Sequence, residues 1–244
     1  MWEYVLLGAL QGIFEWIPVS SEGVVALFSS FLVKDFNSVD LAIFLHLGTL
    51  LALLAYFYKD WKDLILIKDK EFLKFFLIVT FVSGALGYFV YQFSRTAVVG
   101  SGLLLLTGIG LLLTSLMQKK KMELRIGKSA SAVLVGLLQG LSALPGFSRS
   151  GSTIFGLSLT EKDPALILKQ SYLLSAPVVL GSSSYLFLKN PALASQGWIA
   201  LVFSFVFGLL SLNLLLAWAK KIDFSLFALI FGLLCLLGAG LFYL

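Results

Sequence analysis

The chain has 244 residues, of which 59% are apolar and only 13% charged, and its mean hydropathy is +0.97. Because a soluble domain typically carries about 25% charged residues, this composition excludes a water-soluble fold and predicts one membrane domain over residues 1–244. The net charge of +5 does not indicate a nucleic-acid partner, because the basic residues lie in short loops between apolar segments, where they set orientation in the bilayer.

Taken in chain order, the apolar segments are of two kinds, broken and unbroken. Residues 2–33 and 131–158 are interrupted midway by Pro, Gly and Ser, at 18–23 and 145–151, which leaves arms of roughly a dozen residues. A transmembrane helix needs about 20 residues, so each broken segment is predicted to be a re-entrant helix–loop–helix whose irregular backbone is buried in protein. The unbroken segments, three after each broken one, are long enough to span the membrane: 39–58, 72–92, 97–117, 165–188, 197–218 and 223–243. The predicted fold class is therefore an all-α polytopic membrane protein with six transmembrane helices and two re-entrant segments.

The basic residues support this topology. If both broken segments return to the side they came from, fourteen of the 18 Lys and Arg residues lie on one side, whereas Lys34, Arg95 and Lys189 lie on the other. Cytoplasmic loops carry an excess of Lys and Arg. The fourteen-residue side is therefore predicted to be cytoplasmic, and both termini are predicted to lie outside.

The two broken segments resemble each other, which predicts an internal repeat. Residues 5–12 match residues 133–140 at six of eight positions, 128 residues apart, and at the same offset Ser20 aligns with Ser148. Apolar segments can look alike by chance, but the shared Gln, Gly and Ser residues at one offset argue against chance.

This repeat divides the chain into two halves, about 1–118 and about 129–244, each with one broken segment and three spans. Because three is an odd number, the second half is predicted to be inverted relative to the first. One loop then enters from outside and the other from the cytoplasm, so that their tips can meet near the midplane. Transporters with inverted-topology repeats and discontinuous helices share this plan.

Three charged side chains lie deep within the broken segments, where a charge is costly and indicates a functional site by default: Glu15, Glu22 and Arg149. Glu15 lies one helical turn after Gln11 and therefore on the same face. Glu22 follows a pair of serines in the first loop, and Arg149 is flanked by hydroxyls in the second. The only histidine, His46, lies in the first unbroken span, where a hydrogen-bonded packing role is the favoured interpretation.

The loop around Arg149 has the parts of an anion site. Its glycines let backbone N–H groups converge, the following helix offers its positive N-terminal end, and a guanidinium can bind two phosphate oxygens. Carboxylates in the facing loop would repel an anion unless they handle a proton or hold a cation that bridges to the phosphate. Together these groups suggest phosphoryl chemistry at a membrane-buried site. The alternative is that Arg149 neutralises Glu15 or Glu22 in a structural ion pair.

At these residues the sequence resembles the undecaprenyl-diphosphate phosphatase family, also known as the bacitracin-resistance family. The resemblance covers nearly the whole chain and is strongest at 11–23 (QGIFEWIPVSSEG) and 145–153 (PGFSRSGST), with a further similar stretch at 45–50. It implies a plasma-membrane enzyme that removes one phosphate from a C55-type polyprenyl diphosphate, at a site open to the outer face, with a divalent cation, Mg²⁺ or Ca²⁺. Besides this lipid substrate, membrane lipids are expected partners, and a homodimer is a possible assembly.

The resemblance also implies roles for single residues. Arg149 would clamp the diphosphate and stabilise transition-state charge, and Glu15 would act as base or metal ligand. A loop serine, Ser21 more than Ser148, would be a nucleophile or an oxygen ligand. We add the hypothesis that Glu22 is a further catalytic carboxylate and metal ligand. The remaining candidates are predicted to bind the substrate: Gln11, Ser20, Ser148, Ser150 and Thr153.

Two departures from the family pattern weaken the case for catalysis. Many members carry a histidine where this chain has Val24, and a first glutamate where it has Gln11. A histidine base is thus missing at that place, and an amide cannot accept a proton at neutral pH, although Glu22 could supply the missing carboxylate. The alternative function is a polyprenyl-phosphate transporter with weak or no hydrolysis, which the inverted repeat favours.

Overall fold

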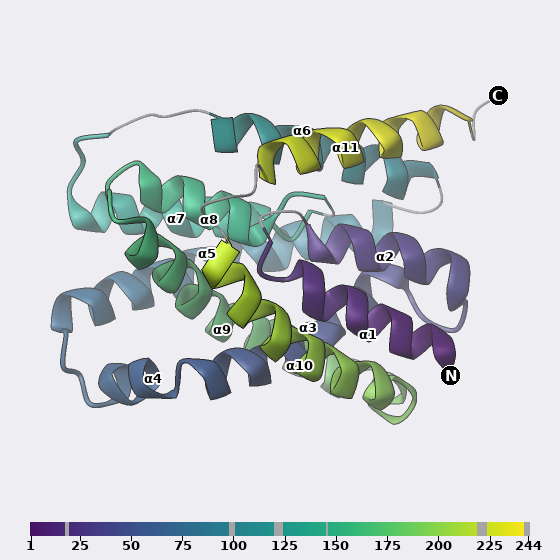
Figure 1. The fold of residues 1–244 in the computed structure, drawn as a ribbon, viewed down its shortest axis with the longest axis horizontal. Helices are drawn as coiled ribbons and strands as arrows, with labels where there is room; N and C mark the ends of the chain where they lie inside the picture. The colour runs from purple at the N-terminus through teal and green to yellow at the C-terminus, as the bar shows by residue number, and fades with distance from the viewer. Residues whose placement is uncertain (18–19, 98–100, 120–123, 145, 219–223, 242–244) are drawn as a thin grey trace.

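A computed structural model describes the chain except for residues 18–19, 98–100, 120–123, 145, 219–223 and 242–244. Outside these gaps the chain forms eleven α-helices and no strand, so the predicted all-α class is confirmed. Figure 1 shows the helices, which have these bounds: α1 Trp2–Phe14, α2 Ser21–Leu32, α3 Ser38–Tyr56, α4 Tyr58–Ile65, α5 Lys70–Ala97, α6 Ser101–Lys119, α7 Lys128–Leu141, α8 Arg149–Ser158, α9 Pro164–Lys189, α10 Ala192–Trp218 and α11 Phe224–Leu241.

The helices α3, α5, α9 and α10 are long and apolar enough to cross a membrane. Their apolar stretches overlap four of the predicted spans: Ser38–Tyr56, Lys70–Ser94, Leu166–Lys189 and Ala192–Leu214. The other two predicted spans, 97–117 and 223–243, fall on α6 and α11, whose described apolar parts are shorter. The chain is therefore a helical membrane protein, while six crossings stay a prediction.

The broken segments form the helix pairs α1–α2 and α7–α8. The breaks overlap the predicted ones, but they end earlier, because residues 21–23 and 149–151 already belong to α2 and α8. The second helix of each pair follows a serine that caps it. Ser20 Oγ and Ser148 Oγ each accept a hydrogen bond from the backbone N–H three residues later, at 3.0 and 3.1 Å. Such a cap satisfies one of the donors that a helix N-terminus leaves free. The two prolines of the predicted breaks, Pro18 and Pro145, lie outside the described residues.

The glycines shared by the two repeats explain how α1 and α7 are held. At Gly8 and Gly12, an added Cβ would lie 2.3 and 2.6 Å from backbone atoms of α10. At the equivalent positions of α7, Gly136 and Gly140, it would lie 2.8 Å from side chains of α5. Small residues let membrane helices approach closely. The repeated Gly-x-x-x-Gly spacing therefore sets α1 against α10 and α7 against α5.

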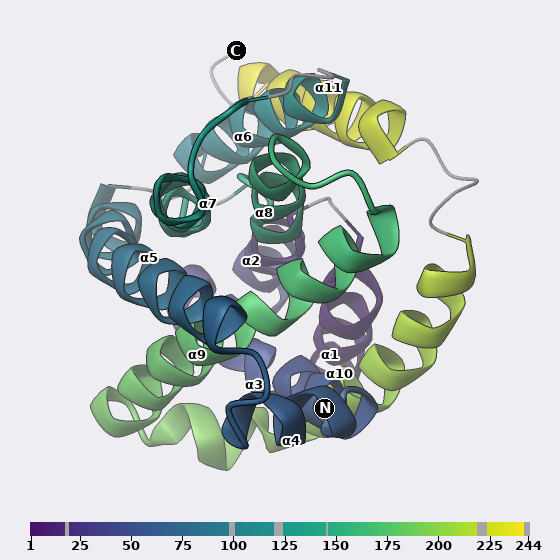
Figure 2. The same ribbon diagram turned by 90° about the vertical axis from the view of Figure 1, so that its left-hand side faces the viewer.

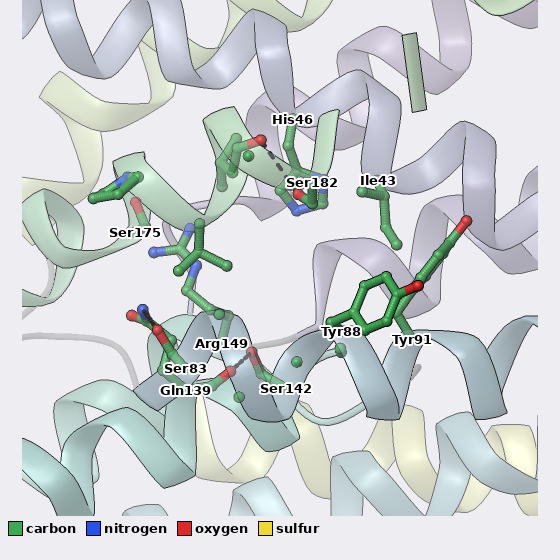
Figure 3. A pocket seen from close by; sticks show the side chains of 18 of the residues that line it. Ile43, His46, Ser83, Tyr88, Tyr91, Gln139, Ser142, Arg149, Ser175 and Ser182 are labelled. Carbon is green, nitrogen blue, oxygen red and sulfur yellow. Dashed lines mark hydrogen bonds between the residues drawn. The ribbon is translucent and has the colours of Figure 1, made fainter. Parts of the chain in front are cut away.

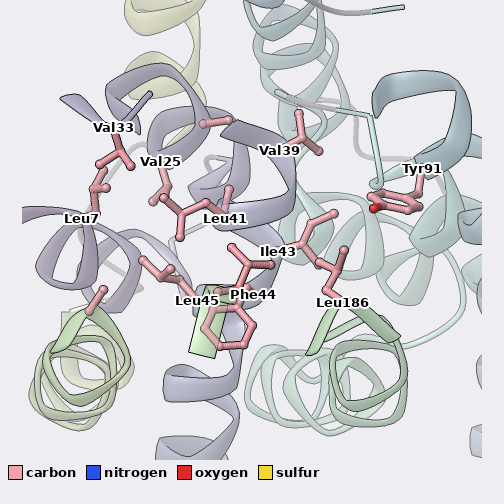
Figure 4. Close-up of a cluster of buried hydrophobic side chains, with 14 residues drawn as sticks. Leu7, Val25, Val33, Val39, Leu41, Ile43, Phe44, Leu45, Tyr91 and Leu186 are labelled. Atoms are coloured by element: carbon pink, nitrogen blue, oxygen red, sulfur yellow. The ribbon is translucent and has the colours of Figure 1, made fainter. Parts of the chain in front are cut away.

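The second helix of each pair lies inside a ring of longer helices. Figure 2 shows α2 and α8 in the middle of the molecule, with α5, α6, α11 and α10 around them. The long helix α3 contacts α2, α9 and α10. A buried cluster fixes α3 against the first helix pair, where Leu41, Phe44 and Leu45 of α3 pack with Leu7 of α1 and Val25 of α2 (Figure 4). This packing brings α3 close to the first loop.

The short helix α4 was not predicted from the sequence. The backbone leaves the helical region at Phe57, with φ −99° and ψ 31°, so α3 ends at Tyr56 and the predicted span over 39–58 is two residues too long. The new helix is tied to α9 by an ion pair between Asp60 and Lys169.

Candidate functional site

The tips of the two helix pairs touch each other. Gly146 N donates a hydrogen bond to Ser20 Oγ at 3.1 Å, and Ser150 Oγ donates to Ile17 O at 3.1 Å. Gly146 has φ +88°, in the left-handed region that favours glycine. An added Cβ there would also lie 2.3 Å from a backbone oxygen of α6. The predicted meeting of the two loops is thus observed, and glycine is required where they meet.

Glu15, at the end of α1, is the centre of a buried polar cluster. Its side chain is 3% exposed, and its Oε2 accepts hydrogen bonds from Gln11 Nε2 at 2.8 Å and from Ser21 Oγ at 2.7 Å. Its Oε1 forms an ion pair with Nη2 of Arg149, which comes from the other half of the chain. Four of the predicted site residues therefore meet at one carboxylate.

His46 of α3 is also part of this cluster. Its Nε2 lies 3.1 Å from Glu15 Oε2, and its Nδ1 lies 2.8 Å from the carbonyl oxygen of Ala42. Both ring nitrogens thus face acceptors, whereas a neutral imidazole has a single N–H. The predicted packing role of His46 fits its burial and its contact with Ala42. The sequence did not predict its second contact, with Glu15.

The ion pair with Glu15 involves only one terminal nitrogen of Arg149. Its Nη2 contacts Glu15, but its Nη1 is buried and has no hydrogen-bond partner among the described residues. A buried donor without a partner costs about 1–3 kcal/mol, and more when it is charged. A purely structural ion pair would leave this cost unexplained, whereas a bound anion would remove it.

Glu22 lies in the first turn of α2 and does not pair with Arg149. Its Oε1 is buried and has no hydrogen-bond partner in the part of the chain that the structure describes. Glu22 does line the same two cavities as Arg149 and His46. It is therefore an acceptor that faces the site and is available to a ligand.

The hydroxyls of the second loop have different surroundings. Ser148 Oγ caps α8 and lies 3.3 Å from Ser150 Oγ, and both serines line the small cavity described below. Thr153 instead contacts Ser171 of α9 and donates to the carbonyl oxygen of Arg149, away from both cavities. Its predicted role in substrate binding stays a prediction, and its contacts indicate that it joins α8 to α9.

Val24, the residue at the place of the family histidine, points away from Glu15. It lines a separate apolar cavity between α2, α6 and α11, together with residues such as Leu111 and Phe231. A histidine at position 24 would lie on that side of α2. In this chain the histidine beside the carboxylate comes from α3 instead.

Two cavities adjoin at the cluster. A small one of about 20 Å³ lies between the loops and is lined by Glu15, Glu22, His46, Arg149 and five hydroxyl-bearing side chains: Ser20, Ser21, Ser142, Ser148 and Ser150. A larger one of about 330 Å³ shares Glu22, His46 and Arg149 with it and extends between α3, α5, α7 and α9. Most of its wall is apolar. Figure 3 shows Arg149 inside this cavity, with Tyr88 and Tyr91 at a distance from it.

A divalent cation would find only part of its ligands in the protein. No group of three or more His, Cys, Asp or Glu residues that could hold a metal occurs among the described residues. Glu15 is already in contact with four side chains, so the free oxygen of Glu22 is the better carboxylate ligand. Mg²⁺ is often bound by one or two carboxylates, water and substrate phosphates. Glu22 Oε1 would therefore be the protein's carboxylate ligand for such an ion, and water and substrate phosphate would have to supply the other ligands.

Comparison with known proteins gives a consistent result over the whole chain. A family model described as bacitracin resistance protein BacA matches residues 4–237. The undecaprenyl-diphosphatase of Methanococcoides burtonii is 34% identical over 260 residues, which cover 96% of this chain and 97% of that protein. The undecaprenyl-diphosphatase of Halothermothrix orenii is 32% identical over 259 residues, 99% of each chain. That of Haloarcula marismortui is 34% identical over 257 residues, 96% of this chain and 95% of that protein.

Proposed function

The chain belongs to the family of bacitracin resistance protein BacA, and from this premise we propose that it hydrolyses undecaprenyl diphosphate to undecaprenyl phosphate and inorganic phosphate. The observation that carries this proposal is the unpartnered Nη1 of Arg149, a buried cationic donor on the wall of both cavities. The names of the relatives support hydrolysis over the alternative of lipid transport.

The diphosphate binds where the two loops meet. Arg149 Nη1 donates to its oxygens while Nη2 stays on Glu15. The helices α2 and α8 both begin at this place, at Ser21 and Arg149, so two positive helix ends favour the bound anion. The hydroxyls of Ser20, Ser148 and Ser150 in the small cavity complete the polar surroundings of the phosphate.

Ser21 and Glu15 have the geometry of a nucleophile beside its base, with Ser21 Oγ donating to Glu15 Oε2 at 2.7 Å. The serine oxygen attacks the terminal phosphorus, its proton passes to Glu15, and the bond to the bridging oxygen breaks, which releases undecaprenyl phosphate. Water then hydrolyses the phosphoserine and releases inorganic phosphate. Arg149 stabilises the charge that develops on the phosphoryl oxygens in both steps.

The remaining residues of the cluster act through Glu15 or on the phosphate. Gln11 Nε2 donates to Glu15 Oε2 and orients the carboxylate, a role for which an amide is suited although it cannot take up a proton. A bound Mg²⁺ or Ca²⁺ would neutralise charge on the phosphate oxygens, and Glu22 Oε1 is the carboxylate oxygen free to hold it. We propose Glu22 as this metal ligand, and its further role as a catalytic carboxylate stays a prediction.

The apolar larger cavity is suited to the first part of the prenyl chain, because it begins at Arg149 and lies between helices that cross the membrane. The fold proposed for this task has six transmembrane helices, two re-entrant pairs and an inverted repeat. Equivalent contacts support the repeat: α1 packs on α10 as α7 packs on α5, and α2 packs on α3 as α8 packs on α9.

We further propose that the termini lie outside and that the site opens to the outer face of the plasma membrane. Cysteine labelling tests this orientation in a Cys235→Ser background, which removes the only native thiol. Lys34→Cys is expected to react with a membrane-impermeant maleimide in intact cells, and Lys68→Cys only after the cells are opened. The reverse pattern would contradict the orientation while leaving the enzymatic proposal intact.

The function itself is tested by phosphate release from undecaprenyl diphosphate with Mg²⁺ or Ca²⁺ in detergent. Arg149→Ala is expected to lower kcat by about 10²–10³-fold. Other enzymes lose about this much when one hydrogen-bond donor that stabilises transition-state charge is removed. Arg125→Ala, which removes an exposed arginine, is the matched control and is expected to retain activity. Bound lipid phosphate without release of phosphate by the wild type would contradict the proposal and favour transport.

A further inference from the structure

The larger cavity has a polar end and an aromatic end. The polar end is lined by Glu22, His46 and Arg149, and the rest of the wall includes Tyr88, Tyr91 and Tyr185. Figure 3 shows Tyr88 and Tyr91 together on the side away from Arg149. Among the described residues, no Asp, Glu, Lys, Arg or His other than Glu22, His46 and Arg149 lines the cavity. A ligand that fills the cavity must therefore be anionic or polar at one end and apolar along the rest.

Three tyrosines from two helices form a rigid cluster at the aromatic end. The ring of Tyr185 on α9 meets the rings of Tyr88 and Tyr91 on α5 edge to face, with centroids 6.2 and 6.3 Å apart. Tyr91 is fixed by a hydrogen bond from its hydroxyl to Asp40 Oδ1 at 2.7 Å. Lys189 donates to the hydroxyl of Tyr185 at 3.2 Å. The cluster joins α5 to α9 and presents ring surfaces to the cavity.

Beside this cluster, the wall between α5 and α9 has glycines in place of side chains. Gly84, Gly87 and Gly181 all line the cavity. An added Cβ at Gly84 or Gly181 would meet no atom within 4 Å, and both residues are exposed. Since both lie in helices apolar enough to span a membrane, this opening faces the lipid and not the water on either side.

The volume of the cavity limits how much of a long ligand it can hold. A water-sized group occupies about 30 Å³ of liquid, so a cavity of about 330 Å³ holds on the order of ten non-hydrogen atoms. Ten carbons correspond to two isoprene units. The rest of a long prenyl chain has to leave the cavity, and the glycine-lined opening leads directly into the bilayer.

We propose that Gly84, Gly87 and Gly181, together with the tyrosine cluster of Tyr88, Tyr91 and Tyr185, form a portal for an isoprenoid chain. The chain passes from the cavity into the membrane between α5 and α9, with its first units against the tyrosine rings. This inference rests on the proposed function, because it assumes a prenyl diphosphate as the ligand. It adds the path of the chain and the residues that select for an isoprenoid.

The portal is tested by filling it. Gly84→Leu and Gly181→Leu place side chains in open space, so they close the opening without a clash in the fold. The matched control is Gly240→Leu, at another helical glycine with no atom within 4 Å, which lies on α11 outside the cavity. The measured quantity is kcat/KM for undecaprenyl diphosphate divided by kcat/KM for dimethylallyl diphosphate, whose single isoprene unit ends inside the cavity.

Closing the portal is expected to lower this ratio by about tenfold, which corresponds to about 1.4 kcal/mol of lost chain binding. Gly240→Leu is expected to leave the ratio at the wild-type value. An unchanged ratio in Gly84→Leu and Gly181→Leu, or an equal fall in Gly240→Leu, would overturn the portal.

A second measurement does not depend on turnover. A farnesyl phosphate that carries a benzophenone at its far end is expected to label peptides of α5 and α9 around Gly84 and Gly181, and Gly84→Leu is expected to reduce this labelling. Labelling confined to other helices would overturn the portal even if the enzyme is active. A wild type that hydrolyses neither diphosphate but is labelled at α5 and α9 would contradict the proposed hydrolysis and support the portal.

Discussion

Replacing His46 with leucine tests whether the Oε2 atom of Glu15 must be held by three donors. In the structure Glu15 Oε2 accepts from Gln11 and Ser21 and lies 3.1 Å from His46 Nε2. A hydrogen bond to a charged group contributes about 1.5–3 kcal/mol, and about 1.4 kcal/mol corresponds to a tenfold change in rate. We therefore expect His46→Leu to lower kcat for phosphate release by about 10- to 100-fold, with a smaller change in KM.

A second substitution separates the two ways in which His46 could act. In His46→Gln an amide N–H can take the place of the Nε2 donor, but the amide cannot take up a proton at neutral pH. Nearly wild-type kcat in this variant would assign His46 to positioning Glu15. A loss as large as in His46→Leu would assign it to proton transfer.

The control for this experiment uses position 24. Because Val24 faces the separate cavity beside α6 and α11, Val24→His is not expected to rescue His46→Leu. Thermal unfolding in detergent shows whether each variant is folded. Full activity of a folded His46→Leu, or its rescue by Val24→His, would refute the assignment of the site histidine to α3.

Three further predictions concern the carboxylate, the loop serines and the helix contacts. Glu22→Gln is expected to raise the Mg²⁺ concentration for half-maximal rate by about tenfold or more, which a metal titration of phosphate release would show; an unchanged titration would contradict the ligand role. Ser21→Ala is expected to abolish the labelled phosphoenzyme that forms from substrate carrying ³²P in its terminal phosphate. Ser148→Ala removes a helix cap, so it is expected to lower the free energy of unfolding by about 1 kcal/mol while the phosphoenzyme still forms. Gly12→Ala is expected to lower the melting temperature, because the added Cβ would lie 2.6 Å from a backbone nitrogen of α10. Gly102→Ala, whose Cβ would meet no atom within 4 Å, is expected to leave the melting temperature equal or higher. Equal changes of melting temperature in the two variants would contradict the close contact at Gly12.

The helix breaks could be predicted because they depend on local sequence. Ser20 and Ser148 cap the second helix of each pair, and the short arms before them have recognisable apolar patterns. The Gly and Gln residues shared at one offset could also be recognised in the sequence. In the structure these glycines lie where α1 and α7 approach the long helices α10 and α5. Such local patterns can be recognised without knowing which helices pack against them.

The partners of individual side chains could not be predicted in the same way. His46 approaches Glu15 because a buried cluster around Phe44 fixes α3 against the first helix pair, and that packing joins residues far apart in the sequence. Thr153 matches the family pattern, yet it contacts α9, since its position on α8 turns it away from the cavities. The direction in which Val24 points depends on the rotation of α2, which a motif does not encode.

The repeat also explains how one carboxylate comes to hold both loops. Ser21 and Arg149 are the first residues of α2 and α8 and stand 128 residues apart, so they occupy equivalent positions in the two repeats. One contacts Oε2 and the other Oε1 of Glu15, whose own counterpart at this offset is Ala143. Two identical loops would have brought together like charges, which repel each other in a medium of low dielectric. Because the two segments differ at these positions, a hydroxyl and a guanidinium contact the two oxygens of a single carboxylate.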